Sequence, residues 1–369
     1  MTNINQHKPL VAVVILNWNG RNFLEKFLPS VLASTYSNLE LYVADNGSSD
    51  DSIAYLQSIG FENFTVSQSE QKVSNFIIRL AENHGFAQGY NLALQQIKHC
   101  DYFVLLNSDV EVSPSWIDPV IELMESDLQI GAAMPKILMY GQDNLFEHAG
   151  AAGGWMDKWG YPFCRGRIFG ELEKDNGQYN DNAEIFWASG AAMFVRAKLF
   201  NDLGGFDADY FAHMEEIDFC WRLKKANYKV MFCSESKVWH VGGGTLPVES
   251  PKKVYLNFRN SLTTLLKNKE TASAAVGTVF FRLILDGIAG GMFLTKGKFR
   301  HILAILRAHW HFFGQLSRHW KKRKENNRRI NALAFQQKAI FNEKGLYKKS
   351  IVFQHFVNKI KTFDKLGIK

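Results

Sequence analysis

The sequence predicts an α/β protein whose doubly wound, mostly parallel sheet is followed by a helical, basic C-terminal region. Short apolar runs alternate with segments of helical periodicity, and polar residues follow each apolar run, where a parallel strand would end. The charge is uneven as well, because residues 252–369 hold 25 Lys and Arg against five Asp and Glu, whereas the preceding residues hold 18 against 31. We therefore divide the chain into an α/β domain, residues 1–250, and a helical basic region, residues 251–369.

Four apolar runs of strand length predict the first strands of the sheet, namely Leu10–Leu16, Leu39–Ala44, Asn75–Arg79 and Tyr102–Leu106. Helical spacing between them predicts helices at Arg21–Ala33 and from Gly85 to about His99. Ligands of open α/β sheets bind outside the carboxyl ends of the strands. The residues at those ends are therefore the first candidates for a site.

The polar triplet Asn107, Ser108 and Asp109 directly follows the fourth run. A carboxylate at the end of a strand, with a short polar neighbour two residues earlier, can reach a divalent cation that holds a diphosphate. An Asx-type turn leading into a helix explains the same residues equally well. On this stretch alone both interpretations stay open.

The exits of two earlier strands offer groups suited to a nucleoside. Asn17 and Asn19 present donors and acceptors, and Asp45 could accept the imide proton of uracil or thymine. Ordinary turns are the commoner meaning of such residues. Backbone N–H groups where a helix opens at Gly85 would suit a phosphate, although the glycine spacing matches neither the Walker nor the dinucleotide-binding pattern.

Beyond the fourth strand the alternation loosens. Gly131–Ile137 and Ile185–Arg196 have strand character, and Ser189 and Gly190 interrupt the second run, which suggests a close approach to a ligand. Tyr140–Asp181 is rich in glycine and aromatic residues and predicts loops and hairpins over the site.

A helix predicted at Phe211–Ala226 begins with three acids, Glu215, Glu216 and Asp218. The helix dipole favours acids there, and Asp218 has a partner four residues later in Arg222, so charge placement alone explains the cluster. Like charges also raise one another's pKa, which would suit a general base.

A further strand is predicted at Tyr228–Cys233, and His240 follows it in a Trp-His pair. A lone histidine beside tryptophan is more often a hydrogen-bonded core residue than a ligand. The glycines at 242–244 suggest a mobile loop that could bring the imidazole to a metal.

Composition indicates a folded protein of a reducing compartment. With 46% hydrophobic residues, the 369-residue chain can bury a sizeable core. Its four cysteines lack the paired short spacing of a disulfide framework or a zinc knuckle, so the cytosol is the simpler location. The first residues show no signal-peptide pattern.

The basic tail predicts helices that meet an anionic partner. Lys252–Lys267 has helical character, and Ala275–Leu294 is apolar but carries Arg282 and Asp286, so it is a poor spanning segment and a reasonable interfacial one. Arg300–Trp320 combines apolar and aromatic faces with basic flanks, which fits attachment to an anionic membrane surface. A helical dimer or a domain-packing face is the alternative.

Seven segments together carry a family resemblance: VVILNWNG, VADNGSSD, ENHGFAQGYN, LLNSDV, SGAAMFVR, GGFDADYFAHMEEIDFCWRL and VWHVGGGT. In these segments and their order the chain resembles the family 2 glycosyltransferases of the GT-A fold, within them the bacterial rhamnosyltransferase-like branch that builds cell-surface polysaccharides. The resemblance covers the chain from about Leu10 to Asn260.

The resemblance implies a nucleotide-sugar site assembled from several strand exits. The residues implied on the nucleoside side are Asn17, Asn19 and Asp45. Those implied beside the diphosphate are Asn83, Gly85 and Asn91, with Asn107, Ser108 and Asp109 at the place of the family's Asp-x-Asp motif. Asp109 and His240 are the implied ligands of a divalent cation, Mg²⁺ or Mn²⁺.

The same resemblance implies that the catalytic base is Glu216, within a Glu-Asp pair that here reads Glu215-Glu216. The implied wall around the donor sugar and acceptor consists of Trp187, Ser189, Gly190 and Asp218. Two departures from the family matter. Asn107 replaces an acid, which weakens the case for tight metal binding, and Glu216 is one methylene longer than the usual Asp, so the choice between Glu215 and Glu216 stays open.

The predicted function is metal-dependent, inverting transfer of a sugar from a nucleoside-diphosphate sugar, such as dTDP-rhamnose or a UDP-sugar. The expected acceptor is a hydroxyl of a glycan or lipid-linked molecule, and the expected location is the inner face of the plasma membrane. A sugar nucleotidyltransferase is an alternative, but it would carry a basic, Gly-rich loop where this chain has Asn17-Trp18-Asn19-Gly20. A nucleic-acid-binding protein would leave the acidic cluster unexplained, so we expect no nucleic-acid partner; the oligomeric state is open.

Overall fold

The structure, a computed structural model, describes residues 8–64, 75–142, 144–242, 250–333 and 341–368. Strands and helices alternate along its first part, as predicted. These elements are β1 (Val11–Asn17), α1 (Arg21–Leu32), β2 (Leu39–Asn46), α2 (Ser52–Ser58), β3 (Glu62–Asn63), β4 (Asn75–Leu80), α3 (Gly85–Leu94), β5 (Tyr102–Asn107), β6 (Val110–Val112) and α4 (Asp118–Ser126). The four predicted strands are β1, β2, β4 and β5, and each ends within two residues of its expected end.

The middle of the chain adds shorter strands and the helix that carries the acidic cluster. Its elements are β7 (Ile130–Met139), β8 (Gly154–Asp157), β9 (Pro162–Cys164), β10 (Arg167–Ile168), β11 (Glu171–Leu172), β12 (Ala183–Ile185), β13 (Ala192–Arg196), α5 (Ala197–Asp202), the 3₁₀ turn η1 (Ala208–Tyr210), α6 (Glu215–Lys225) and β14 (Lys229–His240). The hairpins expected within Tyr140–Asp181 are β8 to β11.

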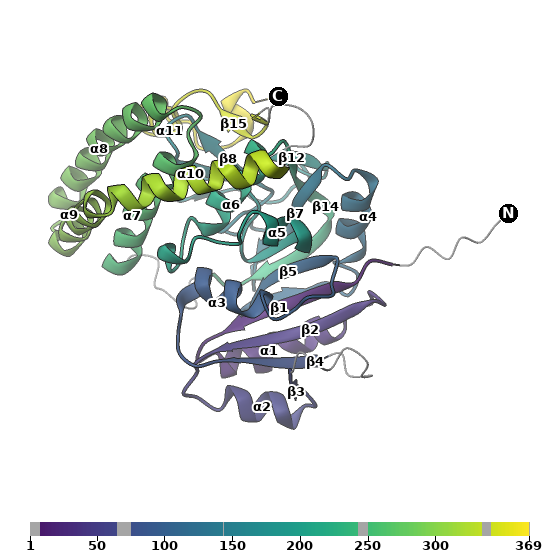
Figure 1. Ribbon diagram of the computed structural model, residues 1–369. Coiled ribbons are helices and arrows are strands. Elements are labelled where there is room, and N and C mark those ends of the chain that lie inside the picture. The colour runs from purple at the N-terminus through teal and green to yellow at the C-terminus, as the bar shows by residue number, and fades with distance from the viewer. Residues whose placement is uncertain (1–7, 65–74, 143, 243–249, 334–340, 369) are drawn as a thin grey trace.

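Within the described residues, ten strands form one large sheet in the order β12-β14-β7-β13-β5-β1-β2-β4-β3, with β6 paired to β14 (Figure 1). β1 runs parallel to both β2 and β5, whereas β13 is antiparallel to β5 and β7. The central strands are buried along nearly their whole length, which explains their uninterrupted apolar sequence. The carboxyl ends of β1, β2 and β5 lie side by side, because Asn17 is in register with Asp45 and Leu16 with Asn107.

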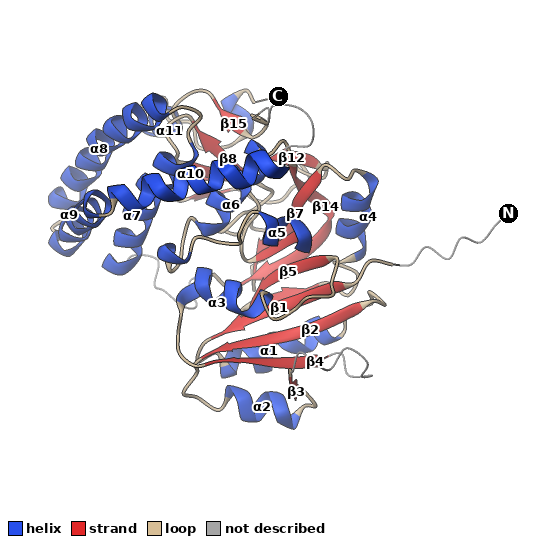
Figure 2. Ribbon diagram, in the orientation of Figure 1, coloured by secondary structure: helices blue, strands red, loops and turns tan. Residues whose placement is uncertain are grey.

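The C-terminal region is mainly helical and packs against the sheet domain (Figure 2). Its elements are α7 (Pro251–Asn268), α8 (Ala272–Thr295), α9 (Phe299–Gly314), α10 (Leu316–Leu333), β15 (Leu346–Tyr347), α11 (Ile351–Phe356) and the 3₁₀ turn η2 (Asp364–Leu366). β15 returns to the domain and pairs with β8, which completes a second sheet in the order β11-β10-β9-β8-β15. α7 and α10 lie over α6, so the two regions share a buried interface (Figure 1).

The run expected as strand at Ile185–Arg196 is divided, because Ile185 ends β12, which pairs with β14, and only Ala192–Arg196 form β13. Four other boundaries differ from those expected. α3 stops at Leu94 because hydrogen bonds of the 3₁₀ type tighten the chain after it. The segment expected as one helix at Arg300–Trp320 breaks at Gln315, next to the poor helix former Gly314. β14 continues to His240, because after a bulge residues 237–240 pair with β7 and β6. The fourth is the start of α6, described below; Gly243, Gly244 and Thr245 lie outside the described residues.

Candidate active site

The exits of β1 and β2 form a hydrogen-bonded polar cluster. Asn17 Nδ2 donates to Asp45 Oδ1 and to Ser48 Oγ, each at 3.2 Å, and the backbone N–H of Asn19 donates to Ser48 Oγ at 2.9 Å. Asn19 adopts a left-handed conformation, and its side-chain oxygen accepts from the Ser49 N–H at 2.7 Å. Asn17 Oδ1 is buried without a hydrogen-bond partner among the described residues. The fold therefore brings together the three residues expected on the nucleoside side.

A second cluster joins the exits of β2 and β4. Asn46 Oδ1 accepts from the His84 N–H at 3.0 Å, and Asn83 Oδ1 accepts from the Gly85 N–H at 2.8 Å. The first N–H groups of α3 are not free for a phosphate, however, because Phe86 and Ala87 donate to the Phe211 carbonyl at 2.6 and 3.2 Å. The phosphate cradle expected at this helix start is therefore already filled by the protein.

Asn91 stands apart from the other residues expected beside the diphosphate. Its Nδ2 donates to the Phe206 carbonyl and its Oδ1 accepts from the Phe206 N–H, both at 2.9 Å. The side chain thereby holds the loop that precedes η1. This use of both ends of the amide commits Asn91 to the fold rather than to a ligand.

The exit of β5 meets the end of β14 at a buried histidine between two acids. Asp109 Oδ1 lies 3.1 Å from His240 Nε2, and Glu147 Oε2 lies 3.2 Å from His240 Nδ1. Burial acts to lower the pKa of His240, but the two carboxylates outweigh it and raise the pKa to about 10. Asn107 Nδ2 lies 3.4 Å from the same Nε2 atom, and Ser108 borders Gly20, where an added Cβ would lie 3.6 Å from Ser108 Oγ.

This donor set fits a divalent cation that is only partly ligated by protein. Among the described residues, no three His, Cys, Asp or Glu side chains gather around one point. Asp109 and His240 Nε2 do converge, and a cation that displaced the Nε2 proton of the imidazolium could be held by both, with a diphosphate and water completing the shell, as is usual for Mg²⁺. Glu147, on the other ring nitrogen, would orient the imidazole in the way that outer-shell carboxylates orient metal-binding histidines.

In the acidic cluster at the start of α6, Glu215 and Asp218 are buried and Glu216 is partly exposed. Burial raises the pKa of Glu216 to about 7, and burial together with the neighbouring Glu216 charge raises the pKa of Glu215 well above its usual value. One carboxylate oxygen of each residue has no hydrogen-bond partner among the described residues. A carboxylate with a pKa near neutrality can accept a proton at physiological pH, which is what a general base requires.

Asn107 and Glu216 border the same turn, residues 189–191. The Asn107 N–H donates to the Ala191 carbonyl at 3.0 Å, and a Cβ added to Gly190 would lie 4.0 Å from the Cβ of Glu216. Asn107, which lies beside the Asp109–His240 pair, and Glu216 therefore border one turn although more than 100 residues separate them in the sequence.

The residues expected to form the sugar wall divide into two groups. Gly190 borders Glu216, as above. Trp187 and Ser189 are buried and bonded within the fold: the Trp187 Nε1–H donates to the Trp155 carbonyl at 3.0 Å, and Ser189 Oγ accepts from the Ala191 N–H at 3.2 Å.

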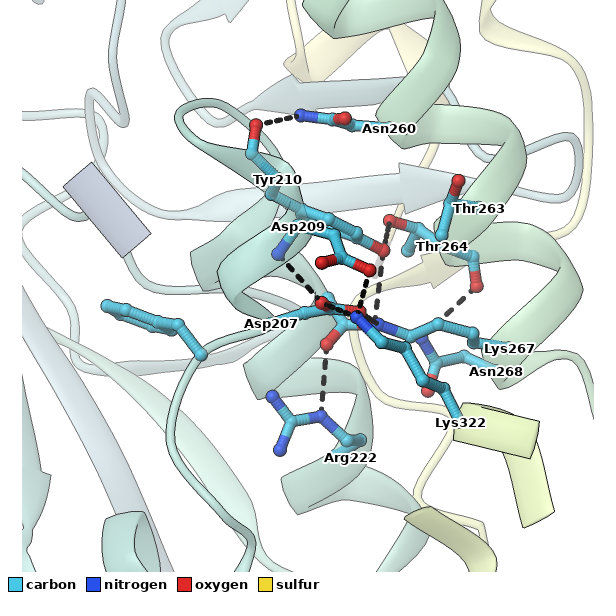
Figure 3. Close-up of polar contacts among 12 residues, drawn as sticks. Asp207, Asp209, Tyr210, Arg222, Asn260, Thr263, Thr264, Lys267, Asn268 and Lys322 are labelled. Atoms are coloured by element: carbon cyan, nitrogen blue, oxygen red, sulfur yellow. Dashed lines mark hydrogen bonds and ion pairs between the residues drawn. The ribbon is translucent and has the colours of Figure 1, made fainter. Parts of the chain in front are cut away.

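The structure does not place Asp218 at that wall. Its carboxylate is fully buried between α6 and α7, where it bonds Arg222 Nε at 3.0 Å, Lys267 Nζ at 2.9 Å and Asn268 Nδ2 at 2.7 Å. Arg222 and Lys267 belong to the buried charge cluster that also contains Asp207 and Lys322 (Figure 3). The pairing with Arg222 expected from the four-residue spacing is confirmed.

Three site residues were not singled out from the sequence: Asn46, Ser48 and Glu147. Asn46 and Ser48 stand directly beside Asp45, so their place at a strand exit was the available signal. Glu147 lies in an irregular segment between β7 and β8 and gave no signal, because its contact with His240 depends on how far β14 extends.

The comparisons with known proteins agree with this geometry. Residues 12–204, more than half of the chain, match the family described as Glycosyl transferase family 2. The chain therefore belongs to glycosyltransferase family 2, and the predicted enzyme class is confirmed.

Individual proteins of known name show which kinds of glycosyltransferase this chain is similar to. The chain is 23% identical to N-acetylglucosaminyl-diphospho-decaprenol L-rhamnosyltransferase of Mycobacterium tuberculosis over 246 residues, which cover 63% of this chain and 76% of the relative. It is 24% identical to O-antigen biosynthesis protein RfbC of Myxococcus xanthus over 63% of this chain but 17% of that relative. The solved structure of GalNAc-T7 with UDP, GalNAc and Mn²⁺ matches with a TM-score of 0.54 at 15% identity, over 71% of this chain and 48% of that chain. The protein thus has the predicted GT-A fold and resembles rhamnosyltransferases of polysaccharide synthesis.

Proposed function

We propose that the protein transfers a sugar from a nucleoside-diphosphate sugar to a hydroxyl of a glycan or lipid-linked acceptor, with inversion at the anomeric carbon. The observation that carries this proposal is that Glu216 borders the same turn, residues 189–191, as Asn107, whose amide lies 3.4 Å from His240 Nε2. The name of the mycobacterial relative specifies rhamnosyl transfer to a lipid diphosphate, so dTDP-rhamnose is the first donor to test and UDP-sugars are the next.

In the proposed reaction each cluster has one task. Asn17, Asn19 and Asp45 bind the nucleoside, and Asp109 and His240 lie beside the diphosphate. A divalent cation held there would neutralise the charge that builds up on the departing diphosphate. Glu216 removes the proton of the acceptor hydroxyl as its oxygen attacks the anomeric carbon in line with the leaving group, so no covalent intermediate forms.

The direct test is a screen of nucleotide-sugars for release of the nucleoside diphosphate, with Mn²⁺ or Mg²⁺ and with a chelator. We expect one donor class to be consumed, and a chelator to suppress the reaction. Glu216→Gln should lower kcat by about 10²- to 10⁴-fold while nucleotide binding is kept. Asp109→Ala should weaken nucleotide binding as well.

The exposed residue Glu235 provides a control, because Glu235→Gln removes a carboxylate that lies in the bulge of β14 and outside the proposed site. Full transfer activity in both Glu216→Gln and Asp109→Ala would refute the site. Transfer that is unchanged by the chelator would refute the proposed cation.

We propose further that α8 and α9 attach the enzyme to the inner face of an anionic plasma membrane. α8 is the helix, among the described residues, that is long and apolar enough to cross a membrane by length and composition alone, with 28% of its apolar window buried. From Val276 to Met292 an exposed apolar side chain recurs every four residues of α8. Further exposed apolar side chains follow on α9. These side chains are Val276, Phe280, Ile284, Ile288, Met292 and Leu294 on α8 and Phe299, Leu303, Leu306, Trp310 and Phe313 on α9.

The charges of α8 face the protein instead. Arg282 and Asp286 are buried and pair at 3.1 Å, and Arg282 also donates to the Gly160 carbonyl at 3.2 Å. The exposed Lys296 and Arg300 lie where the two helices join. One apolar face with basic residues at its edge favours a helix pair lying in the membrane surface. α8 and α9 project on the side where β1 and β2 end, so a lipid-linked acceptor would lie near the site (Figure 1).

A further inference from the structure

The segment between η1 and α6 holds an unusual backbone. Phe211, His213 and Met214 have φ angles of 64°, 71° and 74°, values that residues other than glycine rarely adopt. Met214 immediately precedes Glu215 and Glu216, the first two residues of α6. The conformation of residues 211–214, here called the 211–214 loop, therefore decides where the two carboxylates point.

One buried amide on α7 contacts this loop at several points. Asn260 is fully buried, and its Nδ2 lies 3.1, 3.0 and 2.8 Å from the carbonyl oxygens of Tyr210, Ala212 and His213. An amide has two N–H groups, so these three contacts share them. Figure 3 shows the contact between Asn260 and Tyr210.

The neighbouring residue, Arg259, extends the hold on the loop and orients the amide. Its Nε donates to Asn260 Oδ1 at 2.9 Å, so the donor end of Asn260 must face the loop. Its NH2 group donates to the carbonyls of Asp209 and Tyr210 at 2.8 and 3.1 Å.

On its other side, the 211–214 loop is tied to α3. The Phe211 carbonyl accepts the Phe86 and Ala87 N–H groups. Gly85 permits this approach, because a Cβ at that position would lie 2.7 Å from the Phe211 carbonyl oxygen. The backbone carbonyls of residues 210–213 are thus all bound by groups from outside the loop.

We propose that Asn260 is a positioning residue for the reaction: its amide holds the 211–214 loop in the conformation that aims Glu216 at the acceptor. The inference rests on the proposed role of Glu216 as the base. Asn260 touches neither the base nor any reacting atom in this account, and it acts only through the backbone. The same contacts would stabilise the fold even if Asn260 had no part in the reaction. The experiment must therefore separate a positioning role from a purely structural one.

The experiment compares Asn260→Asp and Asn260→Ala with Thr263→Val. Thr263 lies on α7 and is similarly buried, and within the part of the chain that the structure describes its hydroxyl bonds only the Arg259 carbonyl, at 3.0 Å, so it controls for damage to the helix. In the Asn260 variants we expect kcat to fall about 100-fold with the donor KM unchanged, because a displacement of about 1 Å costs about that much. Amide hydrogen exchange should rise at Phe86 and Ala87. Thr263→Val should match the wild type in both measurements.

A retained kcat together with unchanged exchange at Phe86 and Ala87 would overturn the proposal, as would equal losses in kcat and unfolding temperature in all three variants. If the Asn260 variants do not fold, Arg259→Ala decides, with a loss of kcat and increased exchange expected and wild-type behaviour contradicting the proposal. Hydrogen exchange needs no activity. Absence of transfer in the wild type would therefore refute the proposed function, while the exchange data would still show whether Asn260 holds the loop.

Discussion

Burial controls the chemistry of Glu216 at the scale of the single residue. The usual pKa of a glutamate is about 4.3, and burial raises that of Glu216 to about 7. An acid whose pKa is raised binds its proton up to higher pH. As a base Glu216 would therefore be inactive at low pH and would become active as the pH rises through about 7.

We accordingly expect kcat/KM for the acceptor to rise with pH along a single titration that is half complete at about pH 7 and reaches a plateau about one pH unit higher. The measurement is a pH profile at saturating donor, with Glu235→Gln as the control that keeps it. A profile without a step between about pH 5 and pH 8 would show that this carboxylate does not limit the reaction.

The same scale shows what the sequence could predict about the site. Asn17 and Asp45 were predicted to meet because parallel strands end at one edge, and the register confirms that they do. Glu147 could not be predicted, because its partner His240 is separated from it by the irregular strands of the second sheet. The pairing of Asp218 with Arg222 followed from helix geometry, whereas its contact with Lys267 on α7 did not.

Among the elements, α6 depends on charges from the C-terminal helices. Lys267 on α7 pairs with Asp207 at 2.6 Å and with Asp218 at 2.9 Å, and Lys322 on α10 also contacts Asp207 (Figure 3). Burial alone would raise the pKa values of both acids, but these cations hold them below the usual range.

Removal of Lys267 should therefore leave two acids with too little compensating charge. We expect Lys267→Met to lower the free energy of unfolding by about 3–5 kcal/mol, as measured by urea denaturation. Lys321→Met, at an exposed neighbour on α10, should change it by less than about 0.5 kcal/mol. Equal effects of the two substitutions would mean that the buried cluster contributes nothing specific.

The start of α6 illustrates why element boundaries escaped sequence reasoning. Helical spacing begins at Phe211, but the helix begins at Glu215 because three of the four residues before it take positive φ angles. Each such residue costs about 1–3 kcal/mol, so only tertiary contacts can maintain them. Those contacts come from α3 and α7, which no local pattern reveals.

For the molecule as a whole, the exposed apolar surface of α8 and α9 is suited either to a membrane or to a second copy of the chain. Vesicle binding and light scattering distinguish these two partners. We expect the protein to sediment with vesicles that contain anionic lipid, to do so less with neutral vesicles, and to be partly released by salt. Phe280→Gln with Trp310→Gln should weaken this binding, because these side chains are 67% and 79% exposed.

Phe353→Gln is the control, since Phe353 is similarly exposed but lies on α11. A concentration-dependent dimer in light scattering, abolished by the substitutions on α8 and α9, together with no vesicle binding, would assign the surface to a second copy of the chain instead.

At this scale the sequence predicted the class of fold well. Buried strands and their polar exits report the parallel core directly, and the charge division marks the change to helices at Pro251. Two features could not be predicted from the sequence. They are the insertion of antiparallel β13 between β5 and β7 and the return of β15 to pair with β8. Both depend on pairings between segments distant in the chain.

The Arg259–Asn260 contacts also bear on the exchange of parts between related enzymes. A hybrid that joined residues 8–242 of this chain to the C-terminal helices of another transferase would keep the residues proposed to bind the donor, but α6, which carries the proposed base, would lose the contacts made by α7. The C-terminal helices of the other transferase would need an arginine and an asparagine at the positions of Arg259 and Asn260. A hybrid designed to exchange specificity between related enzymes should therefore be joined after α7 of this protein rather than before it.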